Sequence, residues 1–265
     1  LVAASIIALL VTVGTLVYLR IVCYPAQPSF ATVTGTRHQP VIETVRNATN
    51  EPMRIVLPDE SLVELSPGAT LEYPRIFEDH KREVRLTGDA FFTVAANPDN
   101  PFWVFHEGMI TKVVGTKFKI KAPRGDIGGE VIVYSGKVDV YSNLGRTNLI
   151  RRIWATPDMA SLTTNKKAVL LPDRLVEGVT DNPLPLAGRG EAVRQVTFHD
   201  VPMPALAETL SNVYGLDVIA DDDLASITFT GDISGIGLFK QLDMISMVTN
   251  TRYEVVGSTI CLKRK

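Results

Sequence analysis

The chain has 265 residues, of which 45% are hydrophobic and 21% are charged, and its formal net charge is -2. This length allows two ordinary domains, each with a core of its own. The near-neutral balance gives no electrostatic reason to expect a nucleic-acid partner, because phosphate binding needs a basic patch. Lys263-Arg264-Lys265 is the only strong basic cluster, and we interpret it as a solvated tail.

The stretch 1–22 is predicted to be a transmembrane helix. Residues 1–19 carry no charge and are rich in Leu, Val, Ile and Ala, and about 20 such residues are needed to cross a bilayer. Arg20 and Tyr24 supply the residue types that mark the end of a span. The alternative is a secretory signal peptide, but its apolar region is shorter and follows a basic segment. Because the chain starts at Leu inside this run, a further segment is expected upstream, across the membrane.

A short tether rich in Pro and Thr, 23–40, is predicted to lead into an all-β domain at 41–168. Between Arg82 and Ile120 apolar and polar residues alternate, which is typical of strands with one buried face. Turn-forming types such as Thr87-Gly88-Asp89 separate these runs. The region contains no convincing helical pattern, so we expect a sandwich, a barrel or a short solenoid.

Proline, glycine and charge dominate the next segment, and 169–193 is predicted to be a linker. The last part, 194–265, has the order β-α-β-β-α-β-β. Its first helix ends at Gly215, its second spans 238–248, and a final hairpin turns at Gly257. The predicted fold class is therefore mainly β with a smaller α+β domain.

The sequence contains few candidates for catalytic or ligand-binding residues. Asp221-Asp222-Asp223 lacks the alternating ligands and the glycine of a calcium loop, and we interpret it as a solvated turn. Gly115-Thr116-Lys117 lacks the upstream glycine and the following helix of a phosphate loop. We therefore predict no catalytic, metal-binding or cofactor-binding residue, and no enzyme. None of the four histidines has a metal-ligand spacing: His38, His80, His106 and His199.

Spaced motifs follow one another in the first domain: Leu57–Ser61 with Val63-Glu64-Leu65, Leu71–Pro74, Arg82–Phe92, Pro101-Phe102, Val114–Phe118 and Gly136–Val140. Together they resemble the FecR family of bacterial anti-sigma regulators. The part from 196–203 to the closing hairpin resembles the C-terminal domain of the Bacteroidetes members, a relative of the secretin and TonB short N-terminal domain. The family usually has Gly where Glu60 stands, and Glu and Tyr where Asp89 and Phe91 stand. The resemblance covers about residues 30 to 265, in the expected order.

This resemblance implies a single-pass protein of the bacterial inner membrane, with the residues after about 24 in the periplasm. It also implies a cytoplasmic anti-sigma segment that lies before the present sequence. In such systems the signalling domain of an outer-membrane TonB-dependent transporter contacts the periplasmic part. The signal is relayed to an extracytoplasmic-function sigma factor, so the protein regulates transcription without contacting DNA and without a cofactor.

The partner is predicted to bind the C-terminal domain, because an exposed strand edge can accept a further strand without a deep pocket. The predicted contact surface lies at or beside 198–202 and 216–220. The alternative for the apolar residues of these strands is simple core packing. The residues named for this surface are Phe198, His199, Val201, Pro202, Leu216, Val218 and Ile219.

A second hypothesis is a membrane-anchored module whose β domain binds a glycan or another envelope ligand. Trp103, Phe105 and Trp154, together with the tyrosines, are candidates for a sugar-binding platform. Against this, the alternation around Trp103 indicates burial in the core. A flat row of exposed aromatic side chains favours the second hypothesis, and buried rings count against it.

Overall fold

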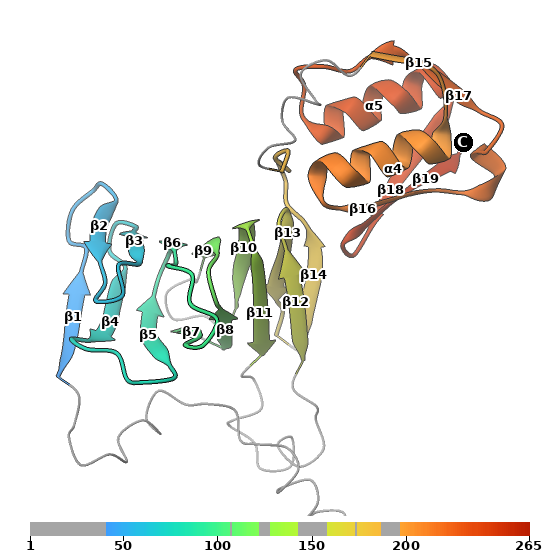
Figure 1. Cartoon of the computed structure of the whole chain (residues 1–265). Helices are drawn as coiled ribbons and strands as arrows, with labels where there is room; N and C mark the ends of the chain where they lie inside the picture. Colours follow the sequence, from blue (N-terminus) through green and yellow to red (C-terminus); the bar gives the residue numbers. More distant parts are fainter. Residues whose placement is uncertain (1–40, 107, 122–127, 143–157, 173, 187–196) are drawn as a thin grey trace, which may run out of the picture.

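The structure, a computed structural model, describes residues 41–106, 108–121, 128–142, 158–172, 174–186 and 197–265. The predicted transmembrane helix at 1–22 and the tether at 23–40 lie outside these ranges. Within them, no helix is long and apolar enough to cross a membrane. The described chain forms a β sandwich with a smaller helical and β domain at one end (Figure 1), which confirms the predicted mainly β character.

The sandwich consists of two seven-stranded sheets that face each other. All neighbouring strands pair antiparallel except β5 and β7, which run parallel. In spatial order the first sheet contains β1 (Ile42–Arg46), β4 (Thr70–Pro74), β5 (Arg82–Thr87), β7 (Phe102–His106), β8 (Met109–Val113), β11 (Lys137–Ser142) and β12 (Met159–Thr163). The second contains β14 (Leu175–Val179), β13 (Lys166–Leu170), β10 (Gly129–Ser135), β9 (Lys117–Lys121), β6 (Ala90–Thr93), β3 (Leu62–Leu65) and β2 (Met53–Val56).

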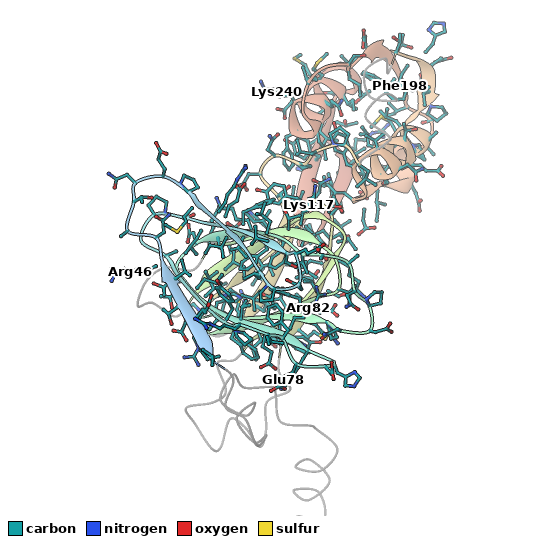
Figure 2. All side chains as sticks on the ribbon, turned by 60° about the vertical axis from the view of Figure 1, so that its left-hand side comes forward. Arg46, Glu78, Arg82, Lys117, Phe198 and Lys240 are labelled. Atoms are coloured by element: carbon teal, nitrogen blue, oxygen red, sulfur yellow. The ribbon has the colours of Figure 1, made fainter. Side chains whose placement is uncertain are left out.

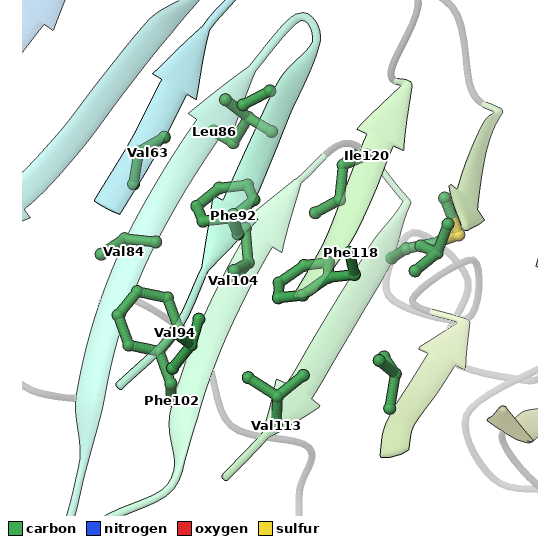
Figure 3. Close-up of a cluster of buried hydrophobic side chains, with 14 of the residues drawn as sticks. Val63, Val84, Leu86, Phe92, Val94, Phe102, Val104, Val113, Phe118 and Ile120 are labelled. Atoms are coloured by element: carbon green, nitrogen blue, oxygen red, sulfur yellow. The ribbon is translucent and has the colours of Figure 1, made fainter. Parts of the chain in front are cut away.

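The core between the sheets is built from the alternating apolar residues of the sequence (Figure 3). Phe92 and Phe118, on neighbouring strands of the second sheet, stack with ring centroids 5.0 Å apart. Phe102 of the first sheet meets Phe92 edge to face at 6.3 Å, so these rings join the two sheets. Burial of each such ring contributes roughly 1.5–3 kcal/mol. The stretch from Arg82 to Ile120 is therefore the centre of the sandwich, as its alternation predicts.

One charged side chain lies inside this apolar core. Arg82 is 2% exposed and its Nη1 donates to Asp59 Oδ2 at 2.7 Å, while its guanidinium carbon lies 5.4 Å from the centre of the Phe102 ring. Figure 2 shows Arg82 within the sandwich. Every side of the guanidinium is used, because its other hydrogen bonds go to backbone carbonyls: Nε to Asn100 at 2.8 Å, Nη1 to Ala95 at 2.9 Å and Nη2 to Val114 at 3.4 Å.

Strand β14 corrects the predicted boundary of the linker. It lies within 169–193, yet it pairs antiparallel with β13 along its whole length, from Leu170 opposite Leu175 to Lys166 opposite Val179. The Leu171 N–H donates to Arg174 O at 2.8 Å, so this part of the predicted linker is the turn of a hairpin. With only five residues, LVEGV, the strand is too short to show a clear alternation, so it could not be told from a linker by its pattern.

The C-terminal domain has the predicted order of helices and strands. Its first helix ends at Gly215, whose φ of +65° is the left-handed conformation that favours glycine at this position, and the Gly215 N–H donates to Ser211 O at 2.8 Å. A two-stranded sheet, β15-β17, and a three-stranded sheet, β16-β19-β18, pack with both helices. The elements are β15 (Thr197–Pro202), α4 (Met203–Tyr214), β16 (Asp217–Ala220), η3 (Asp222–Leu224), β17 (Thr228–Asp232), α5 (Leu238–Thr249), β18 (Thr251–Val256) and β19 (Thr259–Arg264).

Candidate partner-binding site

The three-stranded sheet of the C-terminal domain has two edges, β16 and β18. The β16 edge is partly occupied by the chain itself. Ser211 Oγ of α4 accepts a hydrogen bond from the Val218 N–H at 2.9 Å and donates to Val218 O at 3.1 Å. Both backbone groups at the middle of β16 are therefore satisfied, and a further strand has little to pair with there.

The β18 edge is different, since in the described part of the chain no strand pairs with its outer side. The strand has six residues, and Val255 and Val256 at its end are 44% and 60% exposed. The charged side chains of β18 are held in ion pairs: Glu254 Oε2 lies 2.9 Å from Lys263 Nζ and Glu254 Oε1 lies 3.7 Å from Arg252 Nη2. Native edges are usually protected by charged side chains, a bulge or a cover. Strand β14 contacts β18 where the strand runs into the Gly257 turn, and Arg252 and Glu254 supply charge, but no strand or bulge covers the rest of β18 among the described residues.

Helix α5 supports the inner side of β18. Phe239 and Tyr253 stack with ring centroids 6.3 Å apart, and the Tyr253 hydroxyl donates to Asp243 Oδ1 at 3.0 Å. These contacts hold the strand in place and leave its outer side without a hydrogen-bonded partner strand among the described residues. Helix α5 also exposes Met247, at 76%, and Val248 on its solvent side. The C-terminal domain therefore offers apolar surface beside an open strand edge, which suits a protein partner.

The residues predicted for the partner surface do not form one exposed patch. Three of them, Phe198, Leu216 and Val218, are buried in the apolar core of the domain. Val201 is half-buried and packs against that core. The exposed members are His199, Pro202 and Ile219, on β15 and β16. Their contact with a partner stays a prediction, whereas the β18 edge was not predicted.

The signal for the β18 edge was present in the sequence but was incomplete. Val255-Val256 precedes the Gly257 turn, and two consecutive valines place one apolar side chain on each face of a strand. The sequence does not show that β19 lies between β16 and β18, and that arrangement leaves β18 at the edge.

The groups weighed for chemistry lie apart from one another. Among the described residues, no three His, Cys, Asp or Glu side chains are placed to hold a metal ion. Asp221, Asp222 and Asp223 are exposed around η3. Gly115 approaches the backbone of Ala96 so closely that an added Cβ would lie 2.7 Å from Ala96 Cα. The glycine before Thr116 therefore serves packing between turns.

His106 is the one described histidine in a core. Its Nε2 lies 3.0 Å from the hydroxyl of Thr111, and its Nδ1 has no hydrogen-bond partner. Burial lowers the pKa of His106 to about 3, because the charged imidazolium loses its hydration there. His80 and His199 are exposed, and His38 lies outside the described residues.

The aromatic residues considered for a sugar platform are not arranged as a flat exposed row in the described ranges. Phe105 is buried, and Trp103 is half-buried, with its ring stacked 6.3 Å from Tyr141 and with Lys112 Nζ 5.1 Å from its centre. Trp154 lies outside the described residues. Within the described ranges, Tyr134 is the one aromatic side chain among the exposed large apolar residues. This placement counts against the second hypothesis.

Comparison with known families identifies both folded parts. The sequence model described as FecR protein matches residues 43–139, and the one described as FecR, C-terminal matches residues 195–262. The chain belongs to the FecR family. The resemblance predicted from the spaced motifs is thereby confirmed. Membership in the FecR family supports anti-sigma regulation as the role of the chain, and this role implies a sigma factor as a partner.

Solved structures similar to this FecR-family chain come from Parabacteroides distasonis ATCC 8503. Two crystal structures of a protein described as a candidate anti-sigma factor are 23% identical to it, each with a TM-score of 0.45. The alignments cover 85% of this chain and 100% of that chain in one case, and 84% and 99% in the other. A search of curated proteins found no match.

Proposed function

We propose that this FecR-family chain is a transmembrane anti-sigma regulator that relays a signal from an outer-membrane TonB-dependent transporter to an extracytoplasmic-function sigma factor. Residues 1–22 are the membrane span, and the sandwich and the C-terminal domain lie in the periplasm. The observation that carries the proposal is the match of both FecR models, in order, on one chain.

The β18 edge is the surface at which the transporter's signalling domain docks. Strand addition supplies affinity through main-chain hydrogen bonds, and side chains beside the edge supply specificity. Val255 and Val256 are exposed there, and the ion pairs of Glu254 leave no free charge to repel an incoming strand. The Ser211 hydroxyl, in contrast, already occupies the middle of β16.

The experiment is a binding measurement with the full chain in detergent. The probes are recombinant N-terminal signalling domains of the TonB-dependent transporters encoded in the same genome, immobilised one at a time. The variant carries Val255→Lys and Val256→Lys together. Both side chains are exposed, so the fold is retained, while two lysines at an edge oppose strand pairing. We expect one signalling domain to bind the unaltered chain and at least a tenfold loss of affinity, about 1.4 kcal/mol, in the variant.

The matched control is Val56→Lys, because Val56 is an exposed valine of β2, which is also an edge strand. Binding lost with Val56→Lys and kept with the double variant would place the docking edge on the sandwich. Absence of binding by every signalling domain would refute the transporter relay itself.

A further inference from the structure

The sandwich and the C-terminal domain meet at Asn165, in the turn between β12 and β13. The φ of Asn165 is +67°, a left-handed conformation that Asn tolerates better than most residues, and the residue is 4% exposed. Its backbone belongs to the sandwich region. The Asn165 N–H donates to Val133 O at 2.9 Å, and its carbonyl accepts from the Thr180 N–H at 2.9 Å. The direction of the side chain is therefore fixed from the sandwich.

The side-chain amide of Asn165 is hydrogen-bonded to the connecting segment at Leu184 and to the C-terminal domain at Tyr214. Its Oδ1 accepts the Leu184 N–H at 2.9 Å, and its Nδ2 donates to Leu184 O and to Tyr214 O, each at 2.7 Å. Tyr214 is the last residue of α4, and its carbonyl is among those that a helix leaves without an internal partner. One side chain from the sandwich thus completes the end of a helix in the C-terminal domain. We call these three hydrogen bonds the Asn165 joint.

The hydrogen bonds continue into the C-terminal domain. The Tyr214 hydroxyl donates to Gln241 Oε1 at 3.0 Å, and Gln241 Nε2 donates to Ile233 O at 3.0 Å. Both Tyr214 and Gln241 are buried. A buried polar network with satisfied members specifies one arrangement, because any other leaves groups without partners in a low dielectric. The joint is therefore linked to α5, the helix that supports β18.

Further contacts surround the joint. Val179, at the end of β14, packs in the apolar core of the C-terminal domain rather than in that of the sandwich. Lys166, next to Asn165, forms an ion pair with Asp217 at the start of β16, with Nζ 2.9 Å from Oδ2. The Lys166 side chain is largely buried and that of Asp217 is exposed, so this pair contributes little by itself.

We infer that the Asn165 joint holds the C-terminal domain on the sandwich in a single orientation, so that a partner bound at the β18 edge acts on the sandwich as on one rigid body. The second half of this statement rests on the proposed function, whereas the joint itself does not. Without the three hydrogen bonds, the end of α4 and Leu184 lose their anchor on the sandwich, and the C-terminal domain samples other orientations.

The experiment measures distances between spin labels in the full chain. The labels are attached at Arg54→Cys on β2 and Lys240→Cys on α5, both exposed, with Cys23→Ser and Cys261→Ser to remove the native thiols. Asn165→Asp keeps an oxygen that accepts from the Leu184 N–H but removes the amide group that donates to Leu184 O and to Tyr214 O. Asn165→Gly removes the side chain, and glycine adopts the φ of +67° without strain. We expect one narrow distance distribution in the labelled parent and a broad distribution, with loss of that single peak, in both variants.

The matched control is Asn47→Asp. Asn47 is also buried, and its Nδ2 donates to the carbonyls of Glu51 and Leu65, both within the sandwich. The narrow distribution is expected to survive this change. If both Asn165 variants keep the narrow distribution of the parent, Val179 and the surrounding contacts suffice and the inference is wrong. No partner is present in this measurement, so its failure leaves the proposed function standing, and failure of the transporter to bind leaves the joint standing.

Discussion

Replacement of Arg82 by methionine tests how much the buried Arg82 guanidinium contributes to the stability of the sandwich. Methionine retains much of the apolar stem but removes every hydrogen-bond donor of the guanidinium. Asp59 then loses its cation at 2.7 Å, and the backbone carbonyls that the guanidinium reaches lose their donors. Removal of one member of a buried ion pair costs about 3–5 kcal/mol, because the other charge remains buried. Orphaned carbonyls add to this cost, but the terms overlap.

We therefore expect Arg82→Met to lower the free energy of unfolding by about 4 kcal/mol, a large fraction of the 5–15 kcal/mol that is typical of folded domains. Urea unfolding of the full chain, followed by tryptophan fluorescence, measures this change. Both tryptophans, Trp103 and Trp154, precede the C-terminal domain, so the signal reports the first folded part. The control is Arg54→Met. The Arg54 side chain forms an ion pair with Glu64 and is 74% exposed, so its loss is expected to lower the free energy of unfolding by less than about 1 kcal/mol.

A double variant separates the cost of leaving one charge buried alone from the cost of lost side-chain packing. When Asp59→Leu is combined with Arg82→Met, neither charge is left buried alone, so the double variant should lose less stability than the sum of the two single variants. A loss below about 1 kcal/mol for Arg82→Met, equal to that of Arg54→Met, would refute the view that the guanidinium joins the strands around it.

His106 makes stability depend on pH in a defined direction. It is neutral in the folded protein, where burial lowers its pKa to about 3, whereas in the unfolded chain it takes up a proton below about pH 6.5. The unfolded state thus binds more protons, and His106 should lower stability by up to about 1.4 kcal/mol per pH unit as pH falls from about 6.5 to about 3. Unfolding of His106→Gln across this window should be less steep, and identical pH profiles would contradict the assignment. Gly115→Ala should cost roughly 1–3 kcal/mol, because the new Cβ meets Ala96. The control Gly178→Ala makes only ordinary contacts, at 3.8 Å or more, and equal unfolding midpoints for the two variants would show that the turn relaxes freely.

Most of the fold could be predicted from the sequence, because the local patterns of alternating apolar residues and turn glycines match the strands, helices and turns of the structure. The alternation that passes through Phe92 and Phe118 predicted strands with one buried face, and both rings are in the core. The helix that ends at Gly215 and the hairpin at Gly257 also follow from local signals, since both glycines have positive φ. Glu60 stands where the family usually has Gly, and its φ of +66° explains that usage, because glycine adopts this conformation without strain.

The features that the sequence did not reveal depend on contacts between distant residues. Arg82 and Asp59 are 23 positions apart, and Asn165 and Tyr214 are 49 apart. Neither pair follows a spacing that a helix or a hairpin would impose. The open β18 edge has the same origin, because it depends on the order of strands in a sheet and on the Ser211 hydroxyl that occupies β16. Phe198, Leu216 and Val218 were named for a surface, but their side chains fill the core because an edge strand still has one buried face.

The central claim is that the C-terminal domain receives the signal from the transporter. The most direct test compares the full chain with a chain that lacks residues 197–265 for retention on the immobilised signalling domain that binds best. Tryptophan fluorescence confirms that the shortened chain keeps its first folded part. The account predicts that retention is lost on deletion of 197–265. Equal retention of the two chains would contradict it.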